Sequence, residues 1–448
     1  MTGVKVVKFG GSSLADANQF KKVADIVKTD EARRFVVVSA PGKRYPEDSK
    51  ITDMLYDCYE KAITKKDFEK EYSAIKERYN SIIRDLSLDI SLDEEFEHIK
   101  YSFEHSVGRD YAASRGEYLN AMLLAEYLGF PFLDPVGLLC FDEKGEFDLE
   151  KSAPLIGDKL LELGHAVIPG FYGSMPNNTI KTFSRGGSDI TGSIVANAVD
   201  ADIYENWTDV SGFLICDPRI VNDPKPITTI TYRELRELSY MGASVLHEEA
   251  IFPVRVKGIP INIKNTNHTE DPGTMIVEQT DKSSKYTITG ISGKKGFLTI
   301  NIEKDRMNSM IGFGRSVLRV LEKNGIGFEH IPSGIDTLSV IVREEALKGK
   351  EEIVIEELKS RVKPDHIKIE NDLAIIAVVG RGMKQTRGTA GRIFSALAHA
   401  RINVRMIDQG SSELNIIIGI SESDYEEAIR AIYDMFVLTE EANLPPLT

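Results

Sequence analysis

Cysteine is scarce in this sequence of 448 residues, which contains three, far apart along the chain. Cys58, Cys140 and Cys216 form no CxxC pair, so the sequence indicates neither a disulfide framework nor a zinc site. Long apolar runs are also missing, since none approaches the roughly 18–20 residues that a membrane span needs. The start, MTGVKVVKFGGSS, lacks the apolar stretch of about 7–15 residues that a signal peptide carries. We therefore expect a cytoplasmic protein with no membrane partner.

Positive charge is in deficit. Lys and Arg total 55 against 69 Asp and Glu, which gives a net charge of −14. A general nucleic-acid binder needs a basic surface that displaces counterions, so we expect no nucleic-acid partner. Phosphate-bearing small molecules stay possible, because a few local Lys, Arg and backbone N–H groups suffice to bind them. The apolar share of 42 % is that of an ordinary globular protein, and the length predicts about three domains.

Short strands and helices alternate over residues 1–280, which is typical of an α/β domain. The second of these strands is apolar almost throughout, which predicts burial on both faces, as in a parallel sheet. Residues 53–106 are charged and helical in period, so we expect a helical excursion from the sheet. The expected strands are Val4–Phe9, Arg34–Ser39, Ala166–Pro169, Ile203–Trp207 and Pro260–Lys264.

A polar linker, Gln279–Lys285, separates this domain from two similar modules. The order of elements over residues 296–371 is βαββαβ, which makes a four-stranded antiparallel sheet with helices on one face. The same order begins again at residue 372 but runs out before its last strand. An orphan strand over 286–292 therefore completes the second sheet by strand counting. We expect an α/β domain at 1–280, a first module at 286–371 and a second at 372–448.

The first glycine-rich motif, KFGGSS at Lys8–Ser13, stands where a strand ends and a helix is about to begin. Paired glycines let the backbone approach a ligand closely, and a helix start contributes a positive dipole end. Lys8 adds a mobile point charge that can follow a phosphoryl group. A plain Gly-Gly turn with a surface lysine is the alternative. The GxxxxGK[ST] pattern of a P-loop is absent.

A second glycine-containing loop, Phe183–Asp189, leads into another expected helix. Arg185 offers a guanidinium for a carboxylate or phosphate, and Ser188 and Asp189 stand at the helix start. The alternative is that Ser188 or Asp189 only caps the helix. The concentration of Arg, two Gly, Ser and Asp within five residues favours a binding loop.

Two further segments contain polar residues of interest. Thr208 and Asp209 follow an expected strand, and Arg219 comes ten residues later in an Asp-Pro-Arg turn, so together they could frame a nucleotide. Ser114-Arg115-Gly116-Glu117 opens an expected helix, where Glu117 either binds an ammonium or is a first-turn carboxylate favoured by the dipole. Neither a complete GxGxxG dinucleotide motif nor an HExxH zinc motif occurs.

These motifs, in order, resemble the aspartate kinases of the amino-acid kinase superfamily. The resemblance extends to residues 388–420, which look like the family's second regulatory module, of the ACT type. It implies a three-layer αβα sandwich followed by two ferredoxin-like ACT modules. It also implies transfer of the γ-phosphoryl of ATP to the side-chain carboxylate of L-aspartate, giving 4-phospho-L-aspartate. That reaction begins the biosynthesis of lysine, threonine and methionine.

The resemblance implies a role for each motif residue. Lys8 neutralises the transferring phosphoryl and Asp189 organises Lys8, while Mg²⁺ is held mainly through ATP. The implied aspartate site consists of Ser39, Thr52, Glu117, Arg185 and Ser188. The implied ATP site consists of Lys8, Phe9, Gly10, Gly11, Ser12, Thr208, Asp209, Leu214, Arg219 and Ser244. Leu214 and Ser244 depart from the family, which often carries Tyr and Lys at these positions.

Paired ACT modules imply feedback by an amino acid, most simply L-lysine, alone or with threonine, and a homodimer or tetramer. The positions that match the effector site are Met307, Gly312, Phe313, Phe328, Glu329, Ser333, Gly334 and Asp336. The apolar members could equally belong to the core, and Glu329 to a solvated face. Two other functions stay open: a kinase acting on glutamate or N-acetylglutamate, and a non-catalytic amino-acid sensor.

Overall fold

The computed structural model describes residues 3–105, 108–184, 186–242, 246, 248–280 and 285–442. The contacts divide the chain into two bodies. The first comprises residues 1–213, 226–232 and 245–280, and the second comprises residues 214–225, 233–244 and 281–448. Two short segments of the expected α/β domain therefore group with the C-terminal body. No helix in the described ranges is both long and apolar enough to cross a membrane.

A seven-stranded sheet forms the centre of the first body, in the order β3-β2-β1-β6-β8-β9-β7. Its pairings are parallel except for β8 with β9. The last four residues of β2 are buried, as its apolar sequence predicts, and so are the last four of β1, which include Lys8. The strands are β1 (Lys5–Phe9), β2 (Arg33–Val38), β3 (Ala166–Pro169), β6 (Ile203–Thr208), β7 (Thr229–Thr231), β8 (Ile261–Asn265) and β9 (Thr274–Val277).

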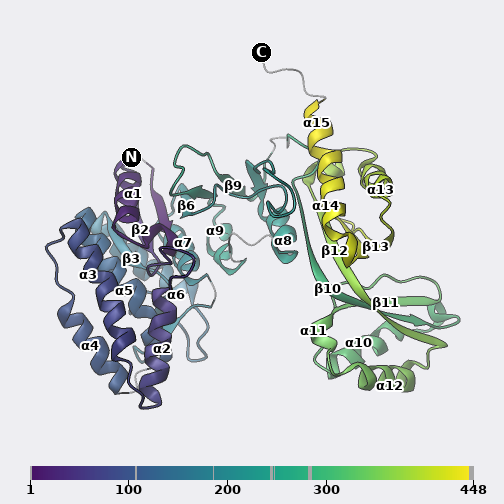
Figure 1. Ribbon diagram of the computed structural model, residues 1–448, viewed down its shortest axis with the longest axis horizontal. Helices are drawn as coiled ribbons and strands as arrows, with labels where there is room; N and C mark the ends of the chain where they lie inside the picture. Colours follow the sequence, from purple (N-terminus) through teal and green to yellow (C-terminus); the bar gives the residue numbers. More distant parts are fainter. Residues whose placement is uncertain are drawn as a thin grey trace. The chain divides into compact units, whose positions relative to one another are not determined.

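Helices cover both faces of this sheet, which confirms the expected α/β layers. Val7 and Phe9 of β1 belong to one core with α1 to α5, and Figure 1 shows α2 to α5 side by side as a layer. Lys8 therefore points to the other face, where α7 packs on β1 and β2 beside α6 and α9. The helices are α1 (Ala17–Lys28), α2 (Ile51–Ile63), α3 (Glu69–Leu86), α4 (Asp93–Glu104), α5 (Arg109–Leu128), α6 (Leu149–Leu163), α7 (Gly187–Ala198) and α9 (Phe252–Val256). A small hairpin, β4 (Tyr172–Ser174) with β5 (Ile180–Thr182), lies outside the main sheet.

The second body contains one antiparallel sheet of five strands, in the order β11-β10-β12-β14-β13. Two strands of 14 residues, β10 (Gly290–Glu303) and β12 (His366–Val379), run through both modules (Figure 1). Residues 290–294 pair with 375–379, beside the second module's β14, whereas residues 297–303 pair with β11. The other strands are β11 (Thr337–Arg343), β13 (Val404–Asp408) and β14 (Asn415–Ser421).

Two expectations about strands in this body are wrong in detail. The orphan strand begins at Gly290 rather than at residue 286, and it continues without a break into the first module. The second strand of the first module, which the βαββαβ order places at residues 327–331, is not continuous: an isolated bridge joins His330 to Ile341, next to Pro332. The helices are α8 (Tyr232–Tyr240), α10 (Phe313–Lys323), α11 (Glu344–Leu347), α12 (Glu351–Val362), α13 (Thr389–His399), α14 (Tyr425–Tyr433) and α15 (Thr439–Ala442). Tyr232 of α8 belongs to the first body and its later residues to the second.

Candidate active site

A buried ion pair joins the two glycine-containing loops. The Lys8 Nζ lies 2.6 Å from Asp189 Oδ1, and the Asn206 Nδ2 donates to the same oxygen at 2.9 Å. The two side chains of the pair are 9 % and 14 % exposed, so water screens the pair weakly. Lys8 stands near the end of β1, Asn206 on the adjacent β6, and Asp189 in the first turn of α7. Two parallel strands and a helix start thus converge on one carboxylate.

Asp189 does not cap α7, contrary to the alternative drawn from the sequence. The N-cap is Gly186, whose φ of 75° is left-handed, and no side chain caps this end. Because Asp189 lies inside the first turn, its carboxylate is free to reach across to Lys8. Tyr204 donates its hydroxyl to the Asp189 backbone carbonyl at 3.2 Å, which further orients this turn. Arg185 lies outside the described residues.

Gly11 packs too tightly for a side chain, whereas a Cβ on Gly10 would approach no atom closer than 3.6 Å. A Cβ on Gly11 would lie 2.9 Å from the Ala40 carbonyl oxygen, and one on Gly42 would lie 2.6 Å from the Gly11 backbone. The Gly42 N–H donates to the Gly11 carbonyl at 2.8 Å. The chain here forms a short 3₁₀ turn over Gly11–Leu14, not an α-helix, and α1 begins only at Ala17. The dipole expected at this motif is therefore that of one short turn.

The residues that flank the two glycines, Phe9, Ser12 and Ser13, lie in different environments. The Phe9 side chain is fully buried against Trp207, with ring centroids 6.2 Å apart, so only its backbone lies at the loop. Ser12 stands within the 3₁₀ turn. Ser13 shares a buried hydrogen bond of 2.7 Å with Thr266, 253 residues away. This last contact ties the loop to the segment after β8.

Glu117 is a buried acid without a complete set of partners. It stands inside α5, which begins at Arg109, so the expectation of a first-turn position is wrong. Gly116 permits this packing, because a Cβ there would lie 2.7 Å from the Ala40 Cβ. The Glu117 Oε2 has no hydrogen-bond partner among the described residues. Burial raises the pKa of Glu117 to about 8, although a backbone hydrogen bond from Ala40 opposes that rise.

Asn120 is a second buried acceptor that sequence reasoning missed. Its Nδ2 donates to the Ser39 carbonyl at 2.7 Å, and its Oδ1 has no partner among the described residues. The signal was its spacing, since Asn120 follows Glu117 by three residues on one helix and so shares its face. Two unpartnered oxygens on one helix face, with Ser39 and Ala40 beside them, fit an ammonium group.

The remaining predicted substrate residues lie at strand or helix ends. Ser39 directly follows β2, and its N–H donates to the Phe9 carbonyl at 3.2 Å. Ser188, in α7, is 8 % exposed, and Gly170 after β3 leaves room for it, since a Cβ there would lie 2.7 Å from the Ser188 Cβ. Thr52, half-buried, is in the first turn of α2. Ser39 and Gly170 thus lie at the carboxyl edge of the sheet, where open α/β sheets bind ligands.

The predicted nucleotide residues divide between the two bodies. Thr208 ends β6, and its hydroxyl lies 3.2 Å from the carboxylate of the exposed Asp209. Leu214 and Arg219 group with the second body. The exposed Arg219 guanidinium lies 2.6 Å from Asp217 and lowers the pKa of that carboxyl. Ser244 lies outside the described residues.

The predicted effector residues lie on two faces of the first module. Met307 and Phe313 are buried with α10 and α12 on the helix side, and Gly312 caps α10 with a φ of 80°. Phe328 is half exposed, and Glu329 instead pairs with Arg343 at 2.8 Å. The other three residues, Ser333, Gly334 and Asp336, stabilise the loop before β11. Asp336 accepts a hydrogen bond from the Arg306 N–H at 2.8 Å. The Gly334 N–H donates to the Thr337 carbonyl, and Ser333 forms an isolated β-bridge with Leu338.

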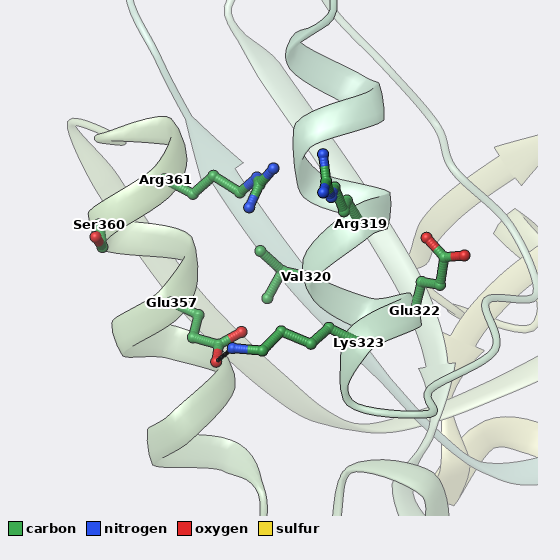
Figure 2. A pocket seen from close by; sticks show the side chains of 7 residues that line it. All are labelled: Arg319, Val320, Glu322, Lys323, Glu357, Ser360 and Arg361. Atoms are coloured by element: carbon green, nitrogen blue, oxygen red, sulfur yellow. Dashed lines mark hydrogen bonds and ion pairs between the residues drawn. The ribbon is translucent and has the colours of Figure 1, made fainter.

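A groove on the first module contains none of the predicted residues. It has a volume of about 470 Å³ and lies between α10 and α12 (Figure 2). Lys323 and Glu357 form an ion pair of 2.5 Å at one end, while Arg319 and Arg361 face each other at the other. No three His, Cys, Asp or Glu side chains of the described residues gather as a metal site.

Comparisons with known proteins agree with the fold described above. The model of the amino acid kinase family matches residues 3–265, and that of the ACT domain matches residues 376–436. The chain is 40 % identical over 448 residues to aspartokinase 3 of Bacillus subtilis (strain 168), covering 97 % of this chain and 98 % of that protein. It is 30 % identical to the chloroplastic aspartokinase 1 of Arabidopsis thaliana, covering 96 % and 80 %.

Solved structures show the same similarity. The aspartate kinase of Clostridium acetobutylicum superposes with a TM-score of 0.90 at 51 % identity, covering 97 % of this chain and 100 % of that one. Aspartokinase III of E. coli in complex with aspartate and ADP superposes with a TM-score of 0.73 at 24 % identity, covering 96 % and 99 %. At that identity the second likeness supports the fold alone.

Proposed function

This chain belongs to the amino acid kinase family and, within it, to the aspartate kinases, and from that premise we propose how its own residues perform the reaction. The side-chain carboxylate of L-aspartate attacks the γ-phosphorus of ATP. The bond from that phosphorus to the bridging oxygen breaks, and 4-phospho-L-aspartate and ADP leave. This step would begin the biosynthesis of lysine, threonine and methionine.

The reaction needs alignment and charge neutralisation more than proton transfer. An aspartate carboxylate is already ionised at pH 7, so no general base is required. Two anions must approach each other, and positive groups placed in a site of weak screening stabilise the transferring phosphoryl. We assign that role to Lys8, whose ammonium is paired with Asp189, a carboxylate that also accepts a hydrogen bond from Asn206. Backbone groups of Gly10, Gly11 and Ser12 would border the phosphates.

Glu117 is the observation that supports an amino-acid substrate most directly. A carboxylate buried without a full set of hydrogen bonds is costly unless a cation compensates it. The ammonium of aspartate supplies that cation, and the Asn120 Oδ1 accepts a second of its hydrogens. Ser188 and Arg185 would hold the α-carboxylate. Ser39 and Thr52 would border the side chain.

Kinases of this family use ATP, and we propose Thr208, Asp209, Leu214, Arg219 and Ser244 as its further contacts. The Asp189 carboxylate beside Lys8 fits a magnesium ion that stays mostly on the nucleotide, since Mg²⁺ usually takes one or two carboxylates together with substrate phosphates. When bound, Mg²⁺ would neutralise charge on the phosphate oxygens. Asp189 is the protein carboxylate placed beside that array, with one oxygen committed to Lys8.

We propose that residues 1–280 carry catalysis, and that residues 286–371 and 372–448 are two regulatory modules that bind an amino-acid effector. The ACT match covers residues 376–436 of the second module, and the first repeats the same order of elements. L-Lysine, alone or with threonine, is the proposed effector. Aspartokinase III of E. coli, a protein of the same fold, has been solved with lysine and aspartate. Met307, Gly312, Phe313 and Phe328 are the contacts we propose, in a homodimer or tetramer.

A trapping assay tests the proposed reaction. Hydroxylamine converts an acyl phosphate to a hydroxamate, which gives a colour with iron(III). We expect hydroxamate only when ATP and L-aspartate are both present. Lysine, threonine and both together, added to the same assay, identify the effector. Equal product with glutamate or N-acetylglutamate would contradict the assigned substrate.

A further inference from the structure

Helix α8 directly follows strand β7 of the first body. Residues of the second body form hydrogen bonds with both ends of this helix. At its first turn, the fully buried Glu234 accepts hydrogen bonds from the Thr289 hydroxyl at 2.5 Å and from the Arg381 N–H at 2.9 Å. The Arg381 Nη1 adds an ion pair of 2.9 Å. These partners belong to the start of β10 and to the turn after β12. This end of α8 is therefore fixed to the second module.

At its last turn, α8 is held by the first module and by β10. The Lys294 Nζ donates to the Tyr240 carbonyl at 2.6 Å, where a cation compensates the negative end of the helix dipole. The Tyr240 hydroxyl donates to Glu329 Oε2. Burial, together with the contact with Glu329, raises the pKa of this phenol to about 12. Tyr240 thus contacts both β10, through Lys294, and the segment before β11, through Glu329.

Glu329 has both carboxylate oxygens occupied. Its Oε1 accepts from the Arg343 Nε at 2.8 Å and its Oε2 from Tyr240, and the side chain is only 9 % exposed. Arg343 lies 5.5 Å from the Phe297 ring centroid, on the face of the sheet away from α10. Val340 and Val342 alternate with it and belong to the core beneath α10 and α12. Glu329 therefore faces α8 and not the Met307–Phe313 turn.

We propose that the Glu329–Tyr240 hydrogen bond couples the first regulatory module to α8, with Tyr240 as a positioning residue that transmits effector binding towards the kinase body. The inference rests on the proposed function in one respect, namely that this module binds an amino acid. Phe328 is a proposed effector contact, and Glu329 is its neighbour in the chain. Phe328 lines a groove together with Arg315 and Leu318 of α10, whereas Glu329 contacts Tyr240 of α8. A ligand that moves Phe328 therefore moves the backbone that carries Glu329.

Tyr240→Phe removes one hydroxyl and leaves the ring, which is about half exposed, so no cavity opens in a core. Tyr425→Phe is the matched control. The Tyr425 hydroxyl donates to the Gly293 carbonyl at 2.7 Å, next to Lys294 on the same strand, so this hydrogen bond is to β10 and not to α8. Both variants lose one phenol hydrogen bond onto the regulatory body. Only Tyr240→Phe loses one from α8.

Hydrogen–deuterium exchange of the full chain tests the hold on α8. We expect Tyr240→Phe to raise the exchange rate of amides in residues 235–242 severalfold, and Tyr425→Phe to leave that segment unchanged. Unchanged exchange in Tyr240→Phe would overturn the proposal. Equal increases in both variants would overturn it as well, because they would show a general loosening of the regulatory body.

Inhibition assays test the transmission. In Tyr240→Phe, we expect lysine or threonine to bind as in the wild type by calorimetry, while its maximal inhibition falls at least twofold. Wild-type inhibition in this variant would overturn the coupling role, and so would a wild-type enzyme that neither amino acid inhibits. Turnover of aspartate without effector is a separate readout. Its absence would refute the proposed function, while the exchange result would still decide whether Glu329 holds α8.

Discussion

The Lys8 Nζ and the Asp189 Oδ1 lie 2.6 Å apart, although 181 positions separate them in the chain. Strand β1 delivers the lysine, and the first turn of α7 delivers the aspartate. The Asn206 Nδ2 donates to the same Asp189 oxygen at 2.9 Å. The lysine is thereby fixed with its charge at the carboxyl edge of the sheet. Such preorganisation lets a cation stabilise a transition state without reorganising first.

Replacing Lys8 tests this assignment. We expect Lys8→Met to lower kcat by about 10²–10³-fold, the scale seen when one preorganised electrostatic group is removed. Lys5→Met is the control on the same strand, because Lys5 pairs with Asp30 at 2.8 Å away from the site. Its kcat should stay close to that of the wild type. Near-normal turnover of a folded Lys8→Met enzyme, checked by circular dichroism, would reject the role.

Aspartate binding should release a proton. The pKa of Glu117 is about 8 in the free protein, so at pH 7 this carboxyl is mostly protonated. An ammonium that binds beside it favours the ionised form, and close to one proton should leave. Calorimetry in Tris and in phosphate buffer measures that number from the difference in binding enthalpy. Glu117→Gln should bind aspartate weakly and release no proton. If the wild type also released no proton on binding aspartate, the assignment would be contradicted.

Stability should depend on pH through the same group. The folded pKa of Glu117, about 8, is above the ordinary value of 4.5, so the folded state holds a proton that the unfolded state loses. The stability that this proton confers is complete below pH 4.5 and is lost as the pH rises through 8. Relative to Glu117→Gln, we expect the wild-type free energy of unfolding to fall by a few kcal/mol, roughly, between pH 5 and 8. Urea titrations of both proteins at several pH values measure this fall. An equal dependence of the unfolding free energy on pH in the two proteins would refute the prediction.

Gly116 should be replaceable only at a cost. A Cβ there would lie 2.7 Å from the Ala40 Cβ, and the backbone would have to shift. We expect Gly116→Ala to destabilise the fold by about 1–3 kcal/mol, because overpacking outweighs the better helix propensity. Gly391→Ala on α13 is the matched control, since open space surrounds that position. It should raise the melting temperature slightly. A Gly116→Ala protein more stable than the wild type would contradict this prediction, because it would show that the backbone at Ala40 shifts at little cost.

Phe328 offers a test of the effector site that spares the core. The side chain is 49 % exposed, so Phe328→Ala should change the melting temperature little. We expect it to raise the lysine concentration needed for half-inhibition about tenfold, which corresponds to about 1.4 kcal/mol of lost contact. Ile353→Ala, on α12 and equally exposed, is the control. Unchanged inhibition in Phe328→Ala would remove that residue from the site.

Sequence patterns predicted the elements that carry the site where burial alone decides them. The apolar runs of β1, β2, β3 and β6 are found within one or two residues of the expected bounds. Their parallel arrangement explains why loops far apart in the chain meet at one edge. The ion pair of Lys8 with Asp189 is consistent with that rule, because Lys8 is the second-last residue of β1 and Asp189 lies in the first turn of α7.

Packing between distant segments explains what the patterns could not show. Gly116 suggested a helix start, but α5 begins seven residues earlier and the glycine instead makes room for Ala40. Gly293, Lys294 and Lys295 interrupt the apolar sequence of β10, yet a Cβ at Gly293 would lie 2.6 Å from the Ile375 carbonyl oxygen, so the neighbouring antiparallel strand β12 requires that glycine. Glu329 suggested a solvated face or an effector contact. Its pairing with Tyr240 depends on α8, which no local pattern connects to it.

The central claim is that this site phosphorylates the side chain of L-aspartate. The direct measurement is the rate of ATP-dependent hydroxamate formation with L-aspartate, L-glutamate and N-acetyl-L-glutamate in parallel, at saturating ATP and magnesium. We predict product from L-aspartate, at a rate that Lys8→Met lowers at least 100-fold, and only background from the other two acids. Background product from L-aspartate with the folded wild-type enzyme, or faster product from either other acid, would contradict the claim.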